Sequence, residues 1–175
     1  NIIVLDSYIN SSKKVLKRLE KIFKNSNINL LERLNTFEGD IRNFEIMNNV
    51  FLKAINIGNP IDGVIHLAGL KSVNDSFKYP LDYWSNNVNG TINLLKVMDI
   101  YNCRNIVFSS SATVYGDSQN IPLRENNEIN PISTYGHTKA AIERILKDLN
   151  NKYSNKWRIA ILRYFNPVGA HFSGL

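Results

Sequence analysis

Short apolar runs alternate with amphipathic stretches along most of the chain. The apolar runs predict buried strands at residues 1–6, 30–40, 60–69, 104–110 and 157–165. The amphipathic stretches carry apolar residues three and four positions apart, which predicts helices at residues 13–24, 43–55, 80–101 and 133–153. Strands that are apolar on both faces and alternate with helices are typical of parallel sheets. The sequence therefore predicts an α/β fold with a doubly wound parallel sheet.

Polar side chains follow the ends of several predicted strands. They are Asp6, Asp40, His66, Ser109, Ser110, Ser111 and Asn166. Ligands of doubly wound sheets bind beyond the carboxyl ends of the strands, which share one edge. We therefore expect these side chains to converge on one ligand site.

Asp6 closes the first predicted strand. In dinucleotide-binding folds an acidic residue at such a strand end binds the ribose hydroxyls of the adenosine half. Its charge would repel a 2′-phosphate and favour NAD over NADP, although Lys13 and Lys14 could approach such a phosphate. A cap for the helix that starts near Ser11 is the alternative role for Asp6.

Tyr135 and Lys139 are four residues apart in a predicted helix, so their side chains share one face. A free phenol has a pKa of about 10 and is a poor base at neutral pH, but a neighbouring ammonium favours the phenolate. Such a tyrosine can take a proton from a substrate alcohol while a hydride leaves the same carbon. A surface Tyr–Lys pair is the alternative.

Ser111 lies just beyond the end of an apolar strand, where its hydroxyl can bind the same substrate oxygen as the phenol. A serine nucleophile is the competing chemistry, but the sequence around Ser111 contains no G-x-S-x-G motif. The sequence also does not place His66, His137 or His171 as its base. We expect His137 to point to another helix face than Tyr135, and His66 to be either a core or a ligand-facing residue.

The composition narrows the class of protein. The chain has 175 residues and a net charge of +6, much of it on the predicted helix at residues 13–24, where it suits a solvated face better than a nucleic-acid site. We expect no membrane span, because no apolar run approaches 20 residues. The single cysteine, Cys103, fits a reducing compartment, so we expect a cytoplasmic protein with a structural thiol. No metal-ligand spacing appears.

Six segments resemble the extended short-chain dehydrogenase/reductase family and its NAD-dependent epimerase/dehydratase members. They are "GDIRN" (39–43), "VIHLAGLKSV" (64–73), "NNVNGT" (86–91), "FSSSATVYGD" (108–117), "YGHTK" (135–139) and "LRYFNPVGAH" (162–171). They occur in family order over nearly the whole chain, and the fourth and sixth are far more specific than Y-x-x-x-K alone. The fold that this resemblance implies is Rossmann-like.

The resemblance implies three groups of site residues. The catalytic residues would be Ser111, Tyr135 and Lys139. Tyr135 and Lys139 would also contact NAD. The other residues that would hold NAD are Asp6, Ser7, Asn10, Ser11, Asp40, Ile41, Leu67, Ala68, Gly69, Leu70, Lys71, Asn86, Ser109 and Phe165. The UDP-sugar would be bound by Lys71, Ser111, Tyr135 and Asn166.

The activity that the resemblance implies is the interconversion of UDP-glucose and UDP-galactose through a 4-keto sugar, by a homodimer. Other UDP-sugar epimerases remain open, and so does a non-catalytic dinucleotide-binding module. A dehydratase is disfavoured, because the segment "SSATVYG" lacks the Asp-Glu pair that such members usually carry.

The chain departs from the family at both ends. It contains no G-x-x-G-x-x-G segment, and it stops shortly after the last predicted strand. We therefore expect residues 1–175 to be a partial Rossmann domain that lacks the first strand and helix and the C-terminal substrate domain. The missing strand would be central in the 3-2-1-4-5-6 order, so the strands at residues 1–6 and 33–37 should not pair with the others. The isolated chain should then be inactive and prone to aggregate.

Overall fold

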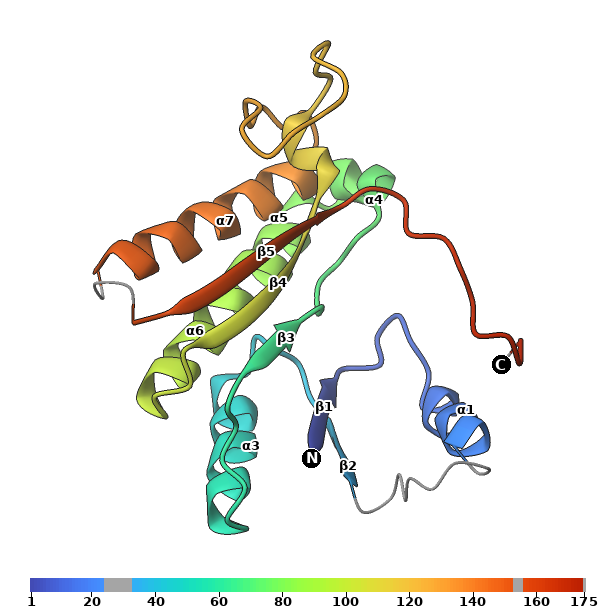
Figure 1. The fold of residues 1–175 in the computed structure, drawn as a ribbon, viewed down its shortest axis with the longest axis vertical. Coiled ribbons are helices and arrows are strands. Elements are labelled where there is room, and N and C mark those ends of the chain that lie inside the picture. Colours follow the sequence, from blue (N-terminus) through green and yellow to red (C-terminus); the bar gives the residue numbers. More distant parts are fainter. Residues whose placement is uncertain (24–32, 153–155, 175) are drawn as a thin grey trace. The chain divides into compact units, whose positions relative to one another are not determined.

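The computed structural model describes residues 1–23, 33–152 and 156–174, which form two compact units. One unit comprises residues 1–40 and 167–175, and the other comprises residues 41–166. Figure 1 labels the helices and strands of both.

The smaller unit contains a parallel pair of strands, β1 (Ile2–Asp6) and β2 (Leu34–Glu38). Their register places Asp6 opposite Glu38. The helix between them, α1 (Lys14–Phe23), keeps its lysines exposed, as its solvated face predicts, and Lys13 pairs with Glu38 at 2.5 Å. Residues 24 and 30–32 of the predicted helix and strand lie outside the described residues.

The larger unit is built on three parallel strands in the order β3-β4-β5. These are β3 (Val64–His66), β4 (Asn105–Ser111) and β5 (Arg158–Tyr164). The helices of this unit are α3 (Phe44–Asn56), α4 (Val73–Lys78), α5 (Pro80–Tyr83), α6 (Gly90–Ile100) and α7 (Thr134–Lys152). A short 3₁₀ turn, Ala112–Tyr115, follows β4 directly.

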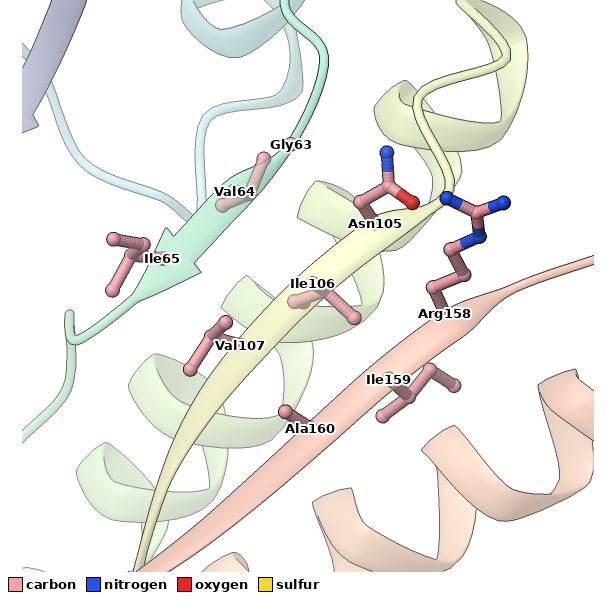
Figure 2. Close-up of a pocket in the computed structure, with 9 residues that line it drawn as sticks. All are labelled: Gly63, Val64, Ile65, Asn105, Ile106, Val107, Arg158, Ile159 and Ala160. Carbon is pink, nitrogen blue, oxygen red and sulfur yellow. The ribbon is translucent and has the colours of Figure 1, made fainter.

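Helices α6 and α7 lie along one face of this sheet (Figure 1). The side chains of β4 alternate accordingly, so that Ile106 and Phe108 are buried with Val97 and Met98 of α6 and Ile142 of α7. The opposite face is largely apolar and more open, and Ile65 on it is 70% exposed. A shallow hollow of about 410 Å³ lies at the beginning of the three strands. Figure 2 labels the residues that line it, which are Gly63, Val64, Ile65, Asn105, Ile106, Val107, Arg158, Ile159 and Ala160.

The predicted parallel α/β fold is confirmed, since every strand pair described is parallel. Within the smaller unit β1 pairs with β2, and within the larger unit β4 pairs with β3 and β5. The predicted separation of these two groups of strands stays a prediction. No helix in the described ranges is both long and apolar enough to cross a bilayer.

Two predicted elements are wrong in their bounds. The single helix predicted at 80–101 is divided into α5, a π-helical segment Trp84–Asn89 and α6, and α4 precedes it with Ser72 as its cap. The strand predicted at 60–69 shortens to β3, because the chain leaves the sheet after His66 and reaches Gly69 at a φ of +155°. The side chain of Asn87, in the π-helical segment, binds the backbone of that departing loop.

Candidate active site

Helix α7 presents Tyr135 and Lys139 on one buried face. The helix begins after Ser133, whose hydroxyl accepts a hydrogen bond of 3.1 Å from the Gly136 amide, as expected of an N-cap. Residues four apart lie one above the other on a helix, so both side chains point towards the sheet. Tyr135 is 9% and Lys139 5% exposed. The alternative of a surface pair is wrong.

Ser111 meets the Tyr135 phenol where β4 turns into the 3₁₀ segment. The Ser111 hydroxyl oxygen accepts hydrogen bonds from the Thr113 amide at 3.2 Å and the Thr113 hydroxyl at 3.0 Å. A hydroxyl has one proton to donate and two lone pairs. Its proton is therefore left for the phenol oxygen, and the hydrogen bond between Ser111 and Tyr135 acts to lower the pKa of the phenol.

The pKa of Tyr135 is nevertheless raised above its ordinary value, because burial disfavours the phenolate more than the Ser111 hydrogen bond favours it. The expectation that Lys139 makes the pKa of the phenol fall below normal is therefore wrong in this structure. The ammonium nitrogen of Lys139 lies 5.7 Å from the centre of the Tyr135 ring, and it donates instead to the Ser109 carbonyl at 2.6 Å.

Lys139 is itself strongly perturbed. Burial lowers the pKa of its ammonium from 10.5 to about 8. The ring of Phe108 lies 4.8 Å below the nitrogen and offers a cation–π contact. Ser109, predicted to contact the cofactor, thus holds the lysine through its backbone oxygen.

Asn87 links the loop of residues 67–71 to helix α7. Its side-chain oxygen accepts from the Leu70 amide at 2.8 Å, and its nitrogen donates to the Leu70 carbonyl at 3.0 Å and to the Thr138 hydroxyl at 3.1 Å. The Thr138 hydroxyl in turn donates to the Tyr135 carbonyl at 2.7 Å. The predicted cofactor loop, with Leu67, Ala68, Gly69, Leu70 and Lys71, is therefore fixed relative to the tyrosine.

The sequence predicts a cofactor contact for Asn86, which stays a prediction, and it gives no role to Asn87. Asn86 is partly exposed, whereas Asn87 is 1% exposed. The segment "NNVNGT" contains both, and only the π-helical turn decides which of them faces inward. A buried asparagine must satisfy both ends of its amide, which explains its position against the irregular loop.

His66 is a core residue, which settles the alternative that the sequence left open. Its Nε2 lies 2.8 Å from the Thr91 hydroxyl, which donates its own proton to the Asn87 carbonyl at 2.5 Å. Nε2 must therefore carry the imidazole proton. Burial, with a smaller contribution from Lys139, lowers the pKa of His66 to about 3, so the ring is neutral. His137 is exposed on another face of α7, as predicted.

The remaining predicted residues divide between the two units. Phe165 and Asn166 follow β5 and are exposed, whereas Ile41 is buried beside Gly90. Asp6, Ser7, Asn10, Ser11 and Asp40 belong to the smaller unit. Asp6 accepts from the Tyr8 amide at 2.7 Å and the Ser11 hydroxyl at 3.1 Å, so it orders the turn before α1. The convergence of Asp6 and Asp40 with the other strand ends stays a prediction.

No group of three His, Cys, Asp or Glu side chains in the described ranges is arranged to hold a metal ion. Cys103 is buried and unbridged, and burial raises the pKa of its thiol. It has the environment of a structural residue.

Comparisons with known proteins agree on one family. The model of the NAD dependent epimerase/dehydratase family matches residues 2–174. UDP-glucose 4-epimerase 2 of Arabidopsis thaliana is 44% identical over 173 residues, which cover 98% of this chain and 46% of that protein. The UDP-glucose 4-epimerase of Bacillus subtilis is 42% identical and is covered to 47%.

A solved structure of UDP-glucose 4-epimerase from Bifidobacterium longum, in complex with NAD+ and UDP, superimposes with a TM-score of 0.88 at 41% identity. It matches 99% of this chain and 48% of its own. The chain thus spans about half the length of these relatives.

Proposed function

The chain belongs to the NAD-dependent epimerase/dehydratase family, and we propose that the whole protein interconverts UDP-glucose and UDP-galactose by inverting C4 through a transient 4-keto sugar. The observation that carries this proposal is the buried group of Ser111, Tyr135 and Lys139. A surface serine, tyrosine and lysine would have no means of excluding water from a keto intermediate.

The residues present fit NAD. The Lys139 ammonium has three donors, and its bond to the Ser109 carbonyl leaves others for ribose hydroxyls. Gly69 allows a close approach of the backbone, because a Cβ there would lie 3.0 Å from the Asn87 side-chain oxygen at a φ of +155°. The remaining NAD contacts in this proposal are those of Asp6, Ser7, Asn10, Ser11, Asp40, Ile41, Leu67, Ala68, Leu70, Lys71, Asn86 and Phe165. The chemistry that NAD supplies when bound is the reversible acceptance of a hydride.

The proton chemistry belongs to this chain. Tyr135 takes the proton of the sugar 4-hydroxyl. The one Ser111 proton, which the phenol oxygen accepts in this structure, is donated to the sugar oxygen when the substrate is bound. The ammonium of Lys139 lies 5.7 Å from the centre of the Tyr135 ring and donates to the Ser109 carbonyl, so its role in this proposal is to bind the nicotinamide ribose. After the keto sugar has turned over in the site, Tyr135 returns the proton to the oxygen at C4, whose configuration is now inverted. Lys71 and Asn166 contact the sugar nucleotide.

Two further features of the whole protein belong to this proposal. It is cytoplasmic and a homodimer, with the segment from α5 to α6 and helix α7 at the interface. Leu81 and Trp84, 80% and 40% exposed, support a contact surface on the first of these. The apolar residues Ile142 and Leu146 of α7 are buried in the core and do not contribute to one.

The test is turnover of UDP-galactose by the purified whole protein, with deuterium at C4 of the sugar. We expect UDP-glucose that keeps the deuterium at C4, because the hydride returns within the site. A product that has lost water would identify a dehydratase. Retention of NAD without any product would identify a non-catalytic module.

A further inference from the structure

A buried ion pair lies one helical turn beyond Lys139. Glu143 of α7 is 1% exposed, and the Arg163 side chain of β5 is 13% exposed. The guanidinium donates twice to the carboxylate, from Nε to Oε1 at 2.9 Å and from NH2 to Oε2 at 2.7 Å. The Ser110 hydroxyl of β4 donates to Oε1 at 2.6 Å. Two strands and one helix therefore meet at a single carboxylate.

The guanidinium also binds the last residue of the 3₁₀ turn and the segment that follows the turn. Its NH1 donates to the Tyr115 hydroxyl at 2.7 Å and to the Glu125 carbonyl at 3.1 Å, and the Tyr115 ring lies 4.9 Å from the guanidinium carbon. Each anchor point adjoins the site: Ser110 precedes Ser111, the turn follows it, and Glu143 shares the buried face of α7 with Lys139.

The charge of Glu143 matters for Lys139. A carboxylate four residues from a lysine on a helix normally pairs with it. Here Arg163 occupies both carboxylate oxygens, and the hydrogen bond described for Lys139 goes to the Ser109 carbonyl. Arg163 thus keeps the carboxylate from drawing the ammonium away from the Ser109 carbonyl.

Stability alone is a poor reason for such a pair. Replacing a buried ion pair with apolar residues of similar volume is often neutral or stabilising, whereas removing one partner leaves a buried charge. An apolar pair could fill the space, but it could not hold Ser110, Tyr115 and Glu125 through directed bonds.

Resting on the proposed function, we propose that Glu143 and Arg163 are positioning residues. Their ion pair fixes the end of β4 against the middle of α7, so that Ser111 meets the Tyr135 phenol, and it keeps Lys139 available to the nicotinamide ribose.

The test uses the whole protein with NAD bound. The variants are the double replacement Glu143→Met with Arg163→Met, the single Arg163→Lys, and the control Arg144→Met, which removes an exposed pair with Asp148 on the same helix. Stability, kcat and KM for UDP-galactose are measured for each. We expect the double variant to keep its stability and its KM within about threefold, while kcat falls by at least about tenfold. The control should match the wild type.

A double variant with wild-type kcat would overturn the proposal. If the double variant does not fold, Arg163→Lys provides the same test. It keeps the positive charge but loses the two parallel hydrogen bonds that the planar guanidinium donates to the carboxylate. Its kcat should fall about fivefold or more, and an unchanged kcat would overturn the proposal.

A wild-type protein without turnover would refute the proposed function. The positioning role of Glu143 and Arg163 could still be tested. Tyrosine labelled with ¹³C then reports the pKa of the Tyr135 phenol, whose titratable neighbours include Tyr83 and Lys139. We expect that pKa to change by about half a unit or more in Arg163→Lys. No change would count against the ion pair as a positioning device.

Discussion

Lys139 holds an ammonium in a place that disfavours its charge. Burial lowers its pKa to about 8, and the bond to the Ser109 carbonyl and the Phe108 ring only partly offset the lost hydration. Strained or desolvated groups at functional sites commonly reduce the stability of the fold. The lysine should therefore contribute to catalysis at the expense of stability.

Replacement of Lys139 with Met should reveal how much the buried ammonium reduces the stability of the fold. Between pH 8 and 9.5 the unfolded chain keeps the lysine proton and the folded chain loses it, so the wild type should gain roughly 1–2 kcal/mol of unfolding free energy over that interval. The variant should lack this gain and should be inactive. Urea unfolding of the whole protein at both pH values measures it, and equal slopes for the two proteins would contradict the buried charge.

His66 should affect the stability of the protein at acid pH, whereas Lys139 affects it at alkaline pH. The folded state keeps it neutral down to a pH of about 3, while the unfolded chain takes up a proton below about 6.5. Stability should therefore fall as the pH falls from 6.5 towards 3. The variant His66→Gln, which can still donate to Thr91, should lose about 2 kcal/mol less than the wild type between pH 6 and 4. Identical acid unfolding would show that His66 is charged or solvated.

The residues that the sequence could identify are those whose spacing carries the chemistry. Tyr135 and Lys139 follow from helical periodicity, and Ser111 from its place at the end of an apolar strand. Asn87, Thr138 and Glu143 could not be found in this way, because their roles depend on partners 17 to 51 residues away. The net direction of the Tyr135 pKa also depends on burial, which a sequence does not give.

At the scale of elements, the junction of the 3₁₀ turn with α7 has no spare room. A Cβ on Gly136 would lie 2.8 Å from the Thr113 carbonyl oxygen, 2.9 Å from the Pro131 Cβ and 3.2 Å from the Ser133 hydroxyl. Thr113 also donates two hydrogen bonds to Ser111. Anything that separates this turn from α7 should therefore move Ser111 away from Tyr135.

Gly136→Ala should accordingly reduce both stability and turnover. We expect a loss of about 1–3 kcal/mol from the overpacked junction and a fall in kcat of about tenfold or more. Gly58→Ala is the control: its Cβ would meet no atom within 4 Å, and its φ of +73° costs only backbone strain, about 1 kcal/mol. Wild-type kcat in Gly136→Ala would show that the junction tolerates displacement.

Helices and strands with a regular apolar periodicity could be predicted from the sequence, whereas a helix interrupted by a π-helical turn could not. The bounds of α3, α7, β4 and β5 lie within one residue of the predictions. The break between α5 and α6 has no Gly or Pro signal inside it, and a π-helical turn does not alter the apolar pattern enough to be seen.

At the scale of the whole chain, the sheet is divided into β1-β2 and β3-β4-β5. How the two groups of strands relate to each other, and how the smaller unit relates to the Ser111 site, stays a prediction. The open face of the three-stranded sheet carries apolar side chains, including Ile65. Exposed apolar strands favour association between chains.

The isolated 175-residue chain should therefore self-associate and bind NAD more weakly than micromolar. Ile65→Lys should shift it towards the monomer without restoring NAD binding, because it removes apolar surface only. Light scattering and calorimetric titration with NAD measure the two effects. A monomeric wild-type chain with micromolar NAD affinity would be incompatible with this view.

The central claim is that the Tyr135 phenol, held by Ser111 beside Lys139, carries the substrate proton. The most direct measurement is the rate of UDP-galactose conversion by the whole protein with Tyr135→Phe, together with its NAD content. We expect NAD to be retained and kcat to fall by about 100-fold or more, since only the phenol oxygen is lost. Conversion at a near-normal rate would contradict the claim.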